Sequence, residues 1–285
     1  MNMVARLPNA EALGARLPPL IVAAERVAAT VRAGVHGRRR PGHGDAFWQF
    51  RPFAQGDAAA RVDWRQSARG DRLYVRETES EAAQTVALWC ADDAGMAWRG
   101  APARPTKRER AELLLLALAA LLIRGGERVR MLGAGRTLAG RGALERLAQD
   151  LDHASGAPED PGLPRHARVV LFGDFWAPLE DWQARLSALS TRGLRGTLVQ
   201  VLDPAEETLP YAGRVRFEGL SGEAPELMPR VEGVRAAYTS RVAAHRDGLA
   251  TVARSNGCNL MTHHTDQPPE AALLALWLSL SGEAG

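Results

Sequence analysis

Three aspartates follow closely on apolar stretches that are typical of buried strands. Asp92 and Asp93 come after one such stretch, and Asp174 comes after another. Parallel sheets bind ligands beyond the carboxyl ends of their strands, so these side chains are candidates for one common site. Carboxylate oxygens suit a hard cation such as Mg²⁺, and a histidine can shuttle protons. A metal-dependent hydrolytic enzyme is therefore one hypothesis, and its residues would be Asp92, Asp93, Asp174 and His263.

The motifs of several common enzyme classes are missing from the sequence. It holds neither a Gly-x-Ser-x-Gly nucleophile elbow nor a Walker loop, so the chain is not itself an ATPase. Gly133-Ala-Gly135 follows a predicted strand, but Leu138 replaces the third glycine of a dinucleotide loop, which favours a tight hairpin. Adjacent histidines on a strand point to opposite faces, so we interpret His263 and His264 as exposed or structural. The sequence favours a protein that is not an enzyme.

A second set of candidate residues combines arginine, aspartate and tryptophan. Arg61 and Arg69 flank Asp63 and Trp64 in a segment with little helical periodicity. Arginine holds carboxylates through two parallel hydrogen bonds, and tryptophan offers a face for stacking. We interpret this network as architectural, with Asp63 and Trp64 mostly buried and Asp63 paired to an arginine, either Arg61 or Arg69. The alternative is a surface that docks a partner.

A third candidate is the run of three arginines Arg38, Arg39 and Arg40. Glycine and proline surround it, which predicts an exposed loop. Such a loop could bind nucleic acid or anionic lipid, so an anion-binding protein is a further hypothesis. The chain is only mildly basic, however, with a net charge of +3 and a pI near 9.3. Because phosphate binding normally uses a wider basic face, a solvated loop or one that docks an acidic partner is favoured, and nucleic acid is not an expected partner.

Strands that alternate with helices must position these residues. The pattern predicts an α/β fold with a mostly parallel sheet and helices on both faces. The expected strands are 85–90, 128–132, 169–172, 197–202 and 260–262. The expected helices are 106–124, 142–151, 179–191, 231–254 and 269–280, and a polar loop is expected after the strand at 197–202.

The helix at 106–124 has the clearest sequence signals. Thr106 and Glu109 are spaced as a capping box, in which each side chain bonds the other residue's backbone amide. Leucines three and four positions apart share one helix face, which we expect to pack on the sheet. These residues are Leu114, Leu115, Leu118 and Leu122.

Two parts are expected along the chain. Residues 1–80 would hold an N-terminal helix that starts after two prolines, the basic loop and an irregular segment with short strands. Residues 81–285 would form the α/β domain. Cys90 and Cys258 lie in apolar runs without metal or disulfide spacing, which indicates reduced, buried thiols. Neither a signal peptide nor a transmembrane run of about 20 residues is expected, so the protein is predicted to be cytoplasmic.

The segment from Phe50 to Arg69 carries a family resemblance. It reads FRPFAQGDAAARVDWRQSAR and continues as LYVRE at residues 73–77. In this order of arginine, aromatic, Gly-Asp, Arg, Asp-Trp and Ser-Ala-Arg it resembles the family called domain of unknown function 58 (DUF58). The later Asp203-Pro204 and Leu209-Pro210 are similar to that family too. The resemblance spans about 40 to 265 and implies a von Willebrand factor A-like domain that follows the signature, and a link to MoxR-type AAA+ ATPases.

Von Willebrand A domains often bind Mg²⁺ through Asp-x-Ser-x-Ser after the first strand, and the resemblance invites that comparison. The aligned positions here hold Ala91, Asp93 and Gly95, so no register supplies a hydroxyl ligand. The second acidic position is retained as Asp174. We therefore expect a degenerate site without a resident cofactor, at most weak Mg²⁺ binding by Asp92, Asp93 and Asp174. The leading hypothesis is a non-catalytic adaptor that works with a MoxR-type AAA+ ATPase and its client.

Overall fold

The computed structural model describes residues 20–32, 47–53, 62–70, 72–78, 83–153, 156–165, 167–220 and 222–282. The chain divides into two compact units. The larger unit comprises Met1–Gly37 and Gln84–Gly285, and the smaller one comprises Arg38–Ala83. All the strands and helices predicted for the α/β domain belong to the larger unit. The basic loop with Arg38, Arg39 and Arg40 lies outside the described residues.

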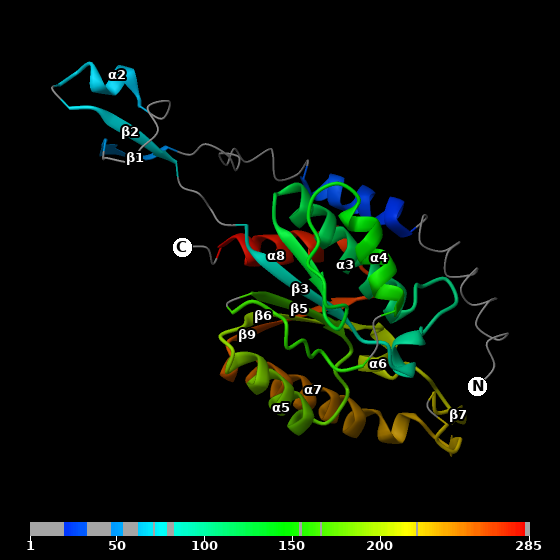
Figure 1. The fold of residues 1–285 in the computed structure, drawn as a ribbon. Coiled ribbons are helices and arrows are strands. Elements are labelled where there is room, and N and C mark those ends of the chain that lie inside the picture. Colours follow the sequence, from blue (N-terminus) through cyan, green and yellow to red (C-terminus); the bar gives the residue numbers. More distant parts are fainter. Residues whose placement is uncertain are drawn as a thin grey trace, which may run out of the picture. The chain divides into compact units, whose positions relative to one another are not determined.

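The larger unit contains a five-stranded parallel sheet, which confirms the predicted fold class (Figure 1). Its order is β4-β3-β5-β6-β9, and every neighbouring pair is parallel. The strands are β3 (Thr85–Cys90), β4 (Arg128–Met131), β5 (Arg168–Gly173), β6 (Arg195–Leu202) and β9 (Cys258–His264). Both faces of the sheet are covered, so its central strands are almost entirely buried and apolar, as in other parallel sheets. Side chains that follow the strands therefore meet at one edge.

Helices lie on both faces of the sheet (Figure 1). One face carries α3 (Lys107–Arg124), α4 (Ala143–His153) and α8 (Pro269–Gly282). The other carries α5 (Leu179–Ser190) and α7 (Glu232–Ser255). The sequence predicted all five helices, with ends that differ by at most two residues. This arrangement is the Rossmann-like α/β class.

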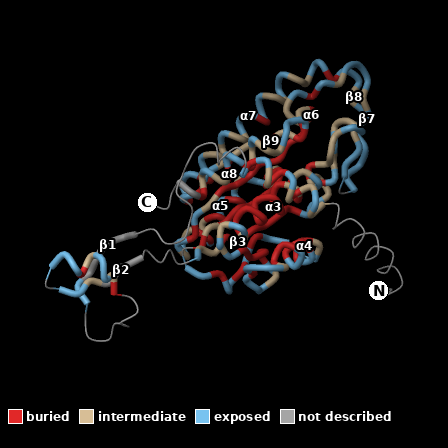
Figure 2. The backbone as a smooth tube through the Cα atoms, turned by 90° about the horizontal axis from the view of Figure 1, so that it is seen from above, coloured by how far each residue is buried: buried red, intermediate tan, exposed pale blue. Residues whose placement is uncertain are grey.

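Helix α3 is the most deeply buried helix in Figure 2. Thr106 and Glu109 form the predicted capping box at its start. Residues 20–32 form a helix whose apolar side chains join the core of the larger unit. Helix α3 packs against the sheet on one side and against α4, α8 and the helix at 20–32 on others. Its apolar residues therefore lie on more than one side. The predicted core leucines are all buried: Leu114, Leu115, Leu118 and Leu122.

The connections of the larger unit hold short elements that the sequence did not predict. They are η3 (Ala94–Ala97), α6 (Pro204–Thr208), β7 (Val215–Phe217) and β8 (Glu226–Met228). The stretch after β6 was expected to be a polar loop, but Asp203 and Glu206 close a capping box there and start α6. The chain folds back after Gly133–Gly135 as predicted, but the antiparallel bridge joins Val129 and Leu138, so the hairpin is wider than the tight one expected.

The smaller unit is a two-stranded antiparallel ribbon with one helical turn. β1 (Phe47–Pro52) pairs with β2 (Tyr74–Thr78), and α2 (Trp64–Ser67) lies between them in the chain. Short strands and turns were predicted for this segment.

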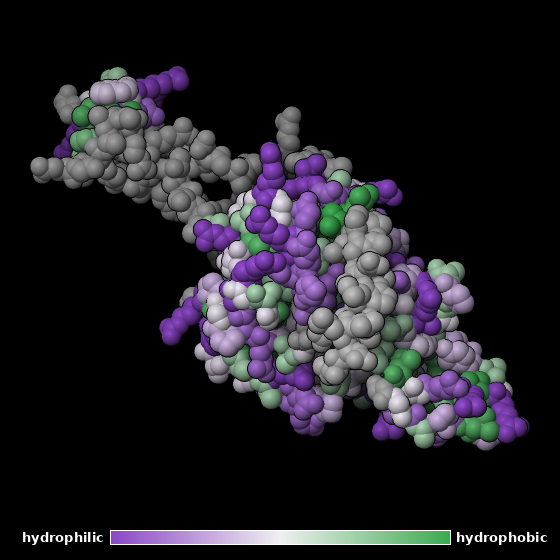
Figure 3. All heavy atoms as spheres, turned by 45° about the vertical axis from the view of Figure 1, so that its right-hand side comes forward, coloured by the Kyte–Doolittle hydropathy of each residue, from purple (hydrophilic) through white to green (hydrophobic). Residues whose placement is uncertain are grey.

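One face of the larger unit is mostly polar. Figure 3 shows a face of the larger unit on which hydrophilic side chains predominate and hydrophobic ones form small groups. Among the described helices, none combines the length and the apolar character that a membrane crossing requires. Large apolar side chains that are exposed include Trp64 in the smaller unit and Leu278 on α8.

Leu118→Ala should destabilise the protein strongly, since the side chain is fully buried at the centre of the core. A loss of about 2–5 kcal/mol in the free energy of unfolding is expected, from lost transfer energy and the cavity left behind. Urea denaturation measures it. Leu278→Ala is the matched control, because that leucine is 45% exposed and should cost well under 1 kcal/mol. Equal losses in both variants would contradict the central position of α3.

Candidate functional site

The carboxyl ends of β3, β5 and β6 bring acidic side chains together. Asp93 follows β3, Asp174 follows β5, and Glu206 lies on α6 directly after β6. These three strands are neighbours in the sheet, so their following loops lie side by side. Asp93 and Asp174 were predicted to meet at this edge, and the structure brings them together. Glu206 was not predicted to join them, since its segment was interpreted as a loop.

A buried lysine occupies the centre of this cluster. The Lys107 Nζ donates a hydrogen bond to Asp174 Oδ2 at 2.7 Å and another to Glu206 Oε1. Lys107 is 1% exposed and Asp174 is 6% exposed, so both charges are removed from water. Buried charges of this kind are stable only when they are paired, because a buried ion without a partner carries a large, uncompensated desolvation penalty. The ammonium group thus supplies the positive charge that the carboxylates need.

The sequence held one sign of this role. Lys107 is the first residue of α3, where the positive end of the helix dipole disfavours a cation. A lysine at such a position conflicts with local preference and indicates a compensating interaction elsewhere. Its partners lie 67 and 99 residues away in the sequence, which is why the spacing of motifs did not reveal them.

Gly95 allows two of the carboxylates to converge. A Cβ atom at this position would lie 2.9 Å from Asp93 Oδ1 and 3.1 Å from Asp174 Oδ2. Burial raises the pKa of Asp93, and the negative charge of Asp174 raises it further, against the opposing effect of Lys107. Burial likewise raises the pKa of Glu206 despite its bond to Lys107. Both carboxyl groups therefore ionise less readily in the folded protein than in water, mainly because they are partly removed from solvent.

The backbone after β5 is strained where it places Asp174. Phe175 has φ +57°, the left-handed region that non-glycine residues seldom adopt. Such a conformation costs on the order of 1–3 kcal/mol and persists only where the surroundings enforce it. The Phe175 ring packs edge-on against Trp182 with centroids 4.7 Å apart, and its carbonyl oxygen lies 2.9 Å from His245 Nε2. These contacts fix the turn that aims Asp174 at Lys107.

A cavity of about 870 Å³ opens beside the cluster. Five aromatic side chains line it: Trp89, Trp98, Phe175, Trp176 and Trp182. Asp92, Asp93, Asp174 and Lys107 also line it, and the β7–β8 connection contributes Glu218 and Leu220. The volume lies within the range of small-molecule and side-chain binding pockets. Asp92 and Asp93 are both exposed, so a ligand can reach them.

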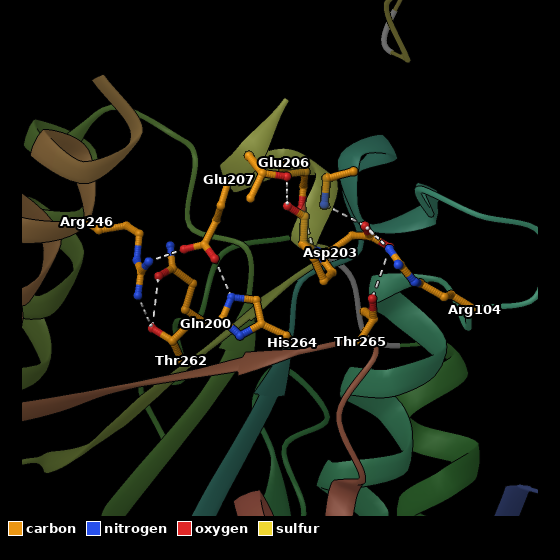
Figure 4. A network of polar contacts seen from close by, with 12 residues as sticks. Arg104, Gln200, Asp203, Glu206, Glu207, Arg246, Thr262, His264 and Thr265 are labelled. Carbon is orange, nitrogen blue, oxygen red and sulfur yellow. Dashed lines mark hydrogen bonds and ion pairs between the residues drawn. The ribbon is translucent and has the colours of Figure 1, made fainter. Parts of the chain in front are cut away.

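A second network locks the neighbouring loops in place (Figure 4). Asp203 is fully buried and accepts hydrogen bonds from the Gly100 amide at 3.0 Å, Arg104 Nη1 at 3.0 Å and Thr265 Oγ1 at 3.1 Å. Burial raises the pKa of Asp203, but these bonds and the one from the Ala205 amide outweigh it, so the pKa lies below its usual value. The carboxylate thus joins the loop before α3 to the ends of β6 and β9.

The histidines at the end of β9 lie apart from the aspartates. His264 Nε2 contacts Glu207, which also pairs with Arg246 (Figure 4). His263 is 2% exposed, and one of its ring nitrogens lies 3.2 Å from Arg110 Nη1. The structural interpretation of both histidines agrees with these contacts. The four-residue hydrolytic site is not assembled, because His263 neither lines the cavity nor contacts the aspartates.

The signature segment differs from its prediction in two respects. Trp64 is 66% exposed, so its predicted burial is wrong; the segment has few apolar neighbours to cover it. Asp63 is partly buried and caps α2 by accepting from the Gln66 amide at 2.9 Å, in place of the predicted arginine pair with Arg69. Arg69 is exposed, and Arg61, the other predicted partner, lies outside the described residues.

The fold and the edge cavity together define a Rossmann-like α/β protein with a ligand-accessible site. The sequence matches the family model of the protein of unknown function DUF58 over residues 49–248. The chain therefore belongs to the DUF58 family. None of the curated proteins matches it.

Solved structures show a distant likeness. An aerotolerance-related membrane protein from Bacteroides fragilis, carrying multiple mutations to serine, has a TM-score of 0.45 and 13% identity, with 70% of this chain and all of that chain covered. The conserved hypothetical protein BatB from Bacteroides thetaiotaomicron has a TM-score of 0.41 and 14% identity at the same coverage. An uncharacterized membrane spanning protein from Vibrio fischeri has a TM-score of 0.22 and 11% identity over 72% of this chain and all of its own. Likeness of this degree does not identify a function.

Lys107→Met should destabilise the protein at neutral pH, because it leaves Asp174 and Glu206 buried without their cation. Breaking a buried ion pair in this way costs about 3–5 kcal/mol. Chemical denaturation measures the loss, and the exposed Arg99 gives a control variant, Arg99→Met, with a near-zero effect expected. A Lys107→Met protein as stable as the parent would show that the carboxylates do not depend on the ammonium group.

His263 should make stability pH-dependent. Burial, aided by the nearby Arg110, lowers the pKa of His263 from 6.5 to about 4. Between those values the unfolded chain binds a proton that the folded chain does not, so stability rises with pH across this window, by up to about 1.4 kcal/mol per pH unit. His263→Gln should flatten the curve there, whereas His153→Gln, at an exposed site, should not. Identical curves for His263→Gln and the parent would refute the assignment.

Proposed function

We propose that this protein is a non-catalytic binding and assembly module of the von Willebrand A-like type, which works with a MoxR-type AAA+ ATPase. The observation that carries the proposal is the Lys107 ammonium group, which is paired to Asp174 and Glu206 at the edge where such modules bind their partners. The site is thereby a preformed, charged and aromatic cavity that needs no metal to be complete. Membership of the DUF58 family supports the choice of partner.

The metal-dependent alternative is less well supported by the side chains present. Within the described residues, no group of three or more His, Cys, Asp and Glu is arranged to hold a metal ion. A divalent cation at the cluster would have to displace Lys107, whose desolvated charge would then lose its partners. Asp93 and Asp174 therefore do not fit a resident Mg²⁺, and weak binding at the exposed Asp92 and Asp93 is the most that the geometry supports.

The smaller unit is proposed to supply a separate contact surface. Trp64 is largely exposed, and the exposed arginines Arg65 and Arg69 lie on the same short segment. Tryptophan and arginine are the residue types that most often dominate the energy of protein interfaces. We assign this surface to the ATPase contact, which leaves the edge cavity of the larger unit for the client. The adaptor would act in the cytoplasm, where an AAA+ ATPase finds its ATP.

Trp64→Ala should weaken binding to the MoxR-type ATPase by at least about 10-fold, because an interface tryptophan typically contributes 2 kcal/mol or more. Its effect on the free energy of unfolding should stay within about 0.5 kcal/mol, since the side chain is exposed. Surface plasmon resonance with the purified ATPase measures the first quantity and urea denaturation the second. Leu278→Ala, another exposed apolar residue, is the control.

The same binding experiment separates an adaptor from a metal-dependent protein. Binding of the ATPase should survive EDTA, because Lys107 already provides the cation of the site. A Trp64→Ala protein that binds normally would refute the assigned surface. Stoichiometric micromolar Mg²⁺ binding in calorimetry, lost in Asp174→Ala, would refute the adaptor with a metal-free site and favour the metal-dependent alternative.

A further inference from the structure

The charged groups that line the edge cavity are unequal in number. Six are carboxylates and two are cations. The carboxylates belong to Asp92, Asp93, Asp174, Glu206, Glu218 and Glu223, and the cations to Lys107 and Arg185. Lys107 is already committed to Asp174 and Glu206, and Glu218 pairs with Arg216 outside the cavity. Negative charge therefore remains at the exposed Asp92 and Asp93, where a positively charged ligand would complement it.

Asp93 is the point at which this negative charge is accessible. Its Oδ1 atom and Asp174 Oδ2 both lie close to Gly95, and the Asp93 residue is exposed. Burial and the charge of Asp174 raise its pKa although Lys107 is near. A second cation beside Asp93 would remove this electrostatic penalty, since an opposite charge favours the ionised carboxylate.

The walls of the cavity are suited to the same kind of ligand. Tryptophan attracts cations to the face of its ring, more strongly where water is excluded. Trp98 and Trp176 are only partly buried and line the cavity together with the carboxylates. Carboxylates between aromatic faces are the combination that recognises ammonium and guanidinium groups. A neutral or anionic ligand would leave this combination unused.

The second cation that lines the cavity is also engaged. The Arg185 guanidinium group lies over the Trp182 ring, 5.0 Å from its centroid. Arginine stacked on tryptophan is the same kind of contact that the other aromatic walls offer to a ligand cation.

We propose that the cavity binds an arginine side chain of a partner polypeptide, with the guanidinium group at Asp92 and Asp93 and between the aromatic walls of the cavity. Arginine fits better than lysine, because its planar group bonds a carboxylate through two hydrogen bonds and stacks on aromatic rings. This assignment rests on the proposed binding function and specifies the chemistry of the client. In a metal-dependent site the partner contributes a carboxylate to the bound cation. Here the partner contributes the positive charge and this protein the carboxylates.

Two short peptides test the assignment on the full chain: acetyl-Gly-Arg-Gly-amide and the same peptide with citrulline, which is nearly isosteric but uncharged. Tryptophan fluorescence and the indole N–H signals in ¹H–¹⁵N spectra report binding. The arginine peptide should bind at least about 10-fold more tightly than the citrulline peptide and shift the indole N–H signals of Trp98 and Trp176, which Trp98→Phe and Trp176→Phe identify. Asp93→Asn should abolish the preference, whereas Asp247→Asn, at an exposed site on α7 outside the cavity, should retain it.

Equal binding of the two peptides, or no binding of either at millimolar concentration, would overturn the assignment. So would displacement of the arginine peptide by Mg²⁺ beyond the effect of NaCl at matched ionic strength, because the carboxylates would then hold a divalent cation. The outcome is independent of the Trp64 experiment. If the parent protein does not bind the ATPase, the proposed function is refuted. If it binds the ATPase but does not prefer the arginine peptide, only the assigned ligand is refuted.

Discussion

A single buried ammonium group holds the carboxyl edge of the sheet together. A parallel sheet delivers the residues that follow β3, β5 and β6 to one place, and in this chain they are acidic. Asp93, Asp174 and Glu206 would repel one another without a compensating charge. The Lys107 Nζ, bonded to Asp174 and Glu206, turns that repulsion into an anchored cluster. The start of α3 is thereby tied to β5 and α6, on which the cavity depends.

The surrounding loops are fixed by other contacts that serve the same geometry. Asp203 joins Gly100, Arg104 and Thr265, so the loop before α3 cannot move independently of β6 and β9. Phe175 holds a left-handed backbone that its packing on Trp182 enforces. Strained backbone conformations of this kind occur where a side chain must be held in one orientation, and here the side chain is that of Asp174. The cavity is thus rigid on the side where its charges lie, which favours binding without rearrangement.

The two surfaces of the chain have opposite chemistry. The edge cavity is acidic and aromatic, whereas the described part of the signature segment exposes Trp64 with Arg65 and Arg69. Rim charges of opposite sign on the two surfaces would steer different partners to each, since electrostatic complementarity acts mainly on specificity and on the rate of association. An adaptor that joins an ATPase to its client needs such a distinction. The chemistry therefore agrees with the proposal of two partners for one chain.

The sequence by itself determined the layers of this protein. Alternating apolar runs and capping signals placed all five strands of the sheet and the five helices that cover it, because burial on both faces leaves a strong pattern. It also placed Asp93 and Asp174 at one edge, since parallel strands must end together. The short α6, β7 and β8 were missed because a few residues carry too little pattern.

Only the tertiary structure decided what occupies that edge. The position of Lys107 at a helix start indicates that a cation there needs partners, but those partners come from segments 67 and 99 residues further along the chain. Ion pairs between distant segments leave no spacing in a sequence, whereas helices and strands do. Trp64 was expected to be buried because the acidic residues and arginines around it were interpreted as an architectural network, but a small ribbon has too little apolar surface to cover it. Local periodicity thus specified the fold, and long-range packing specified the charge and the exposure of its binding surfaces.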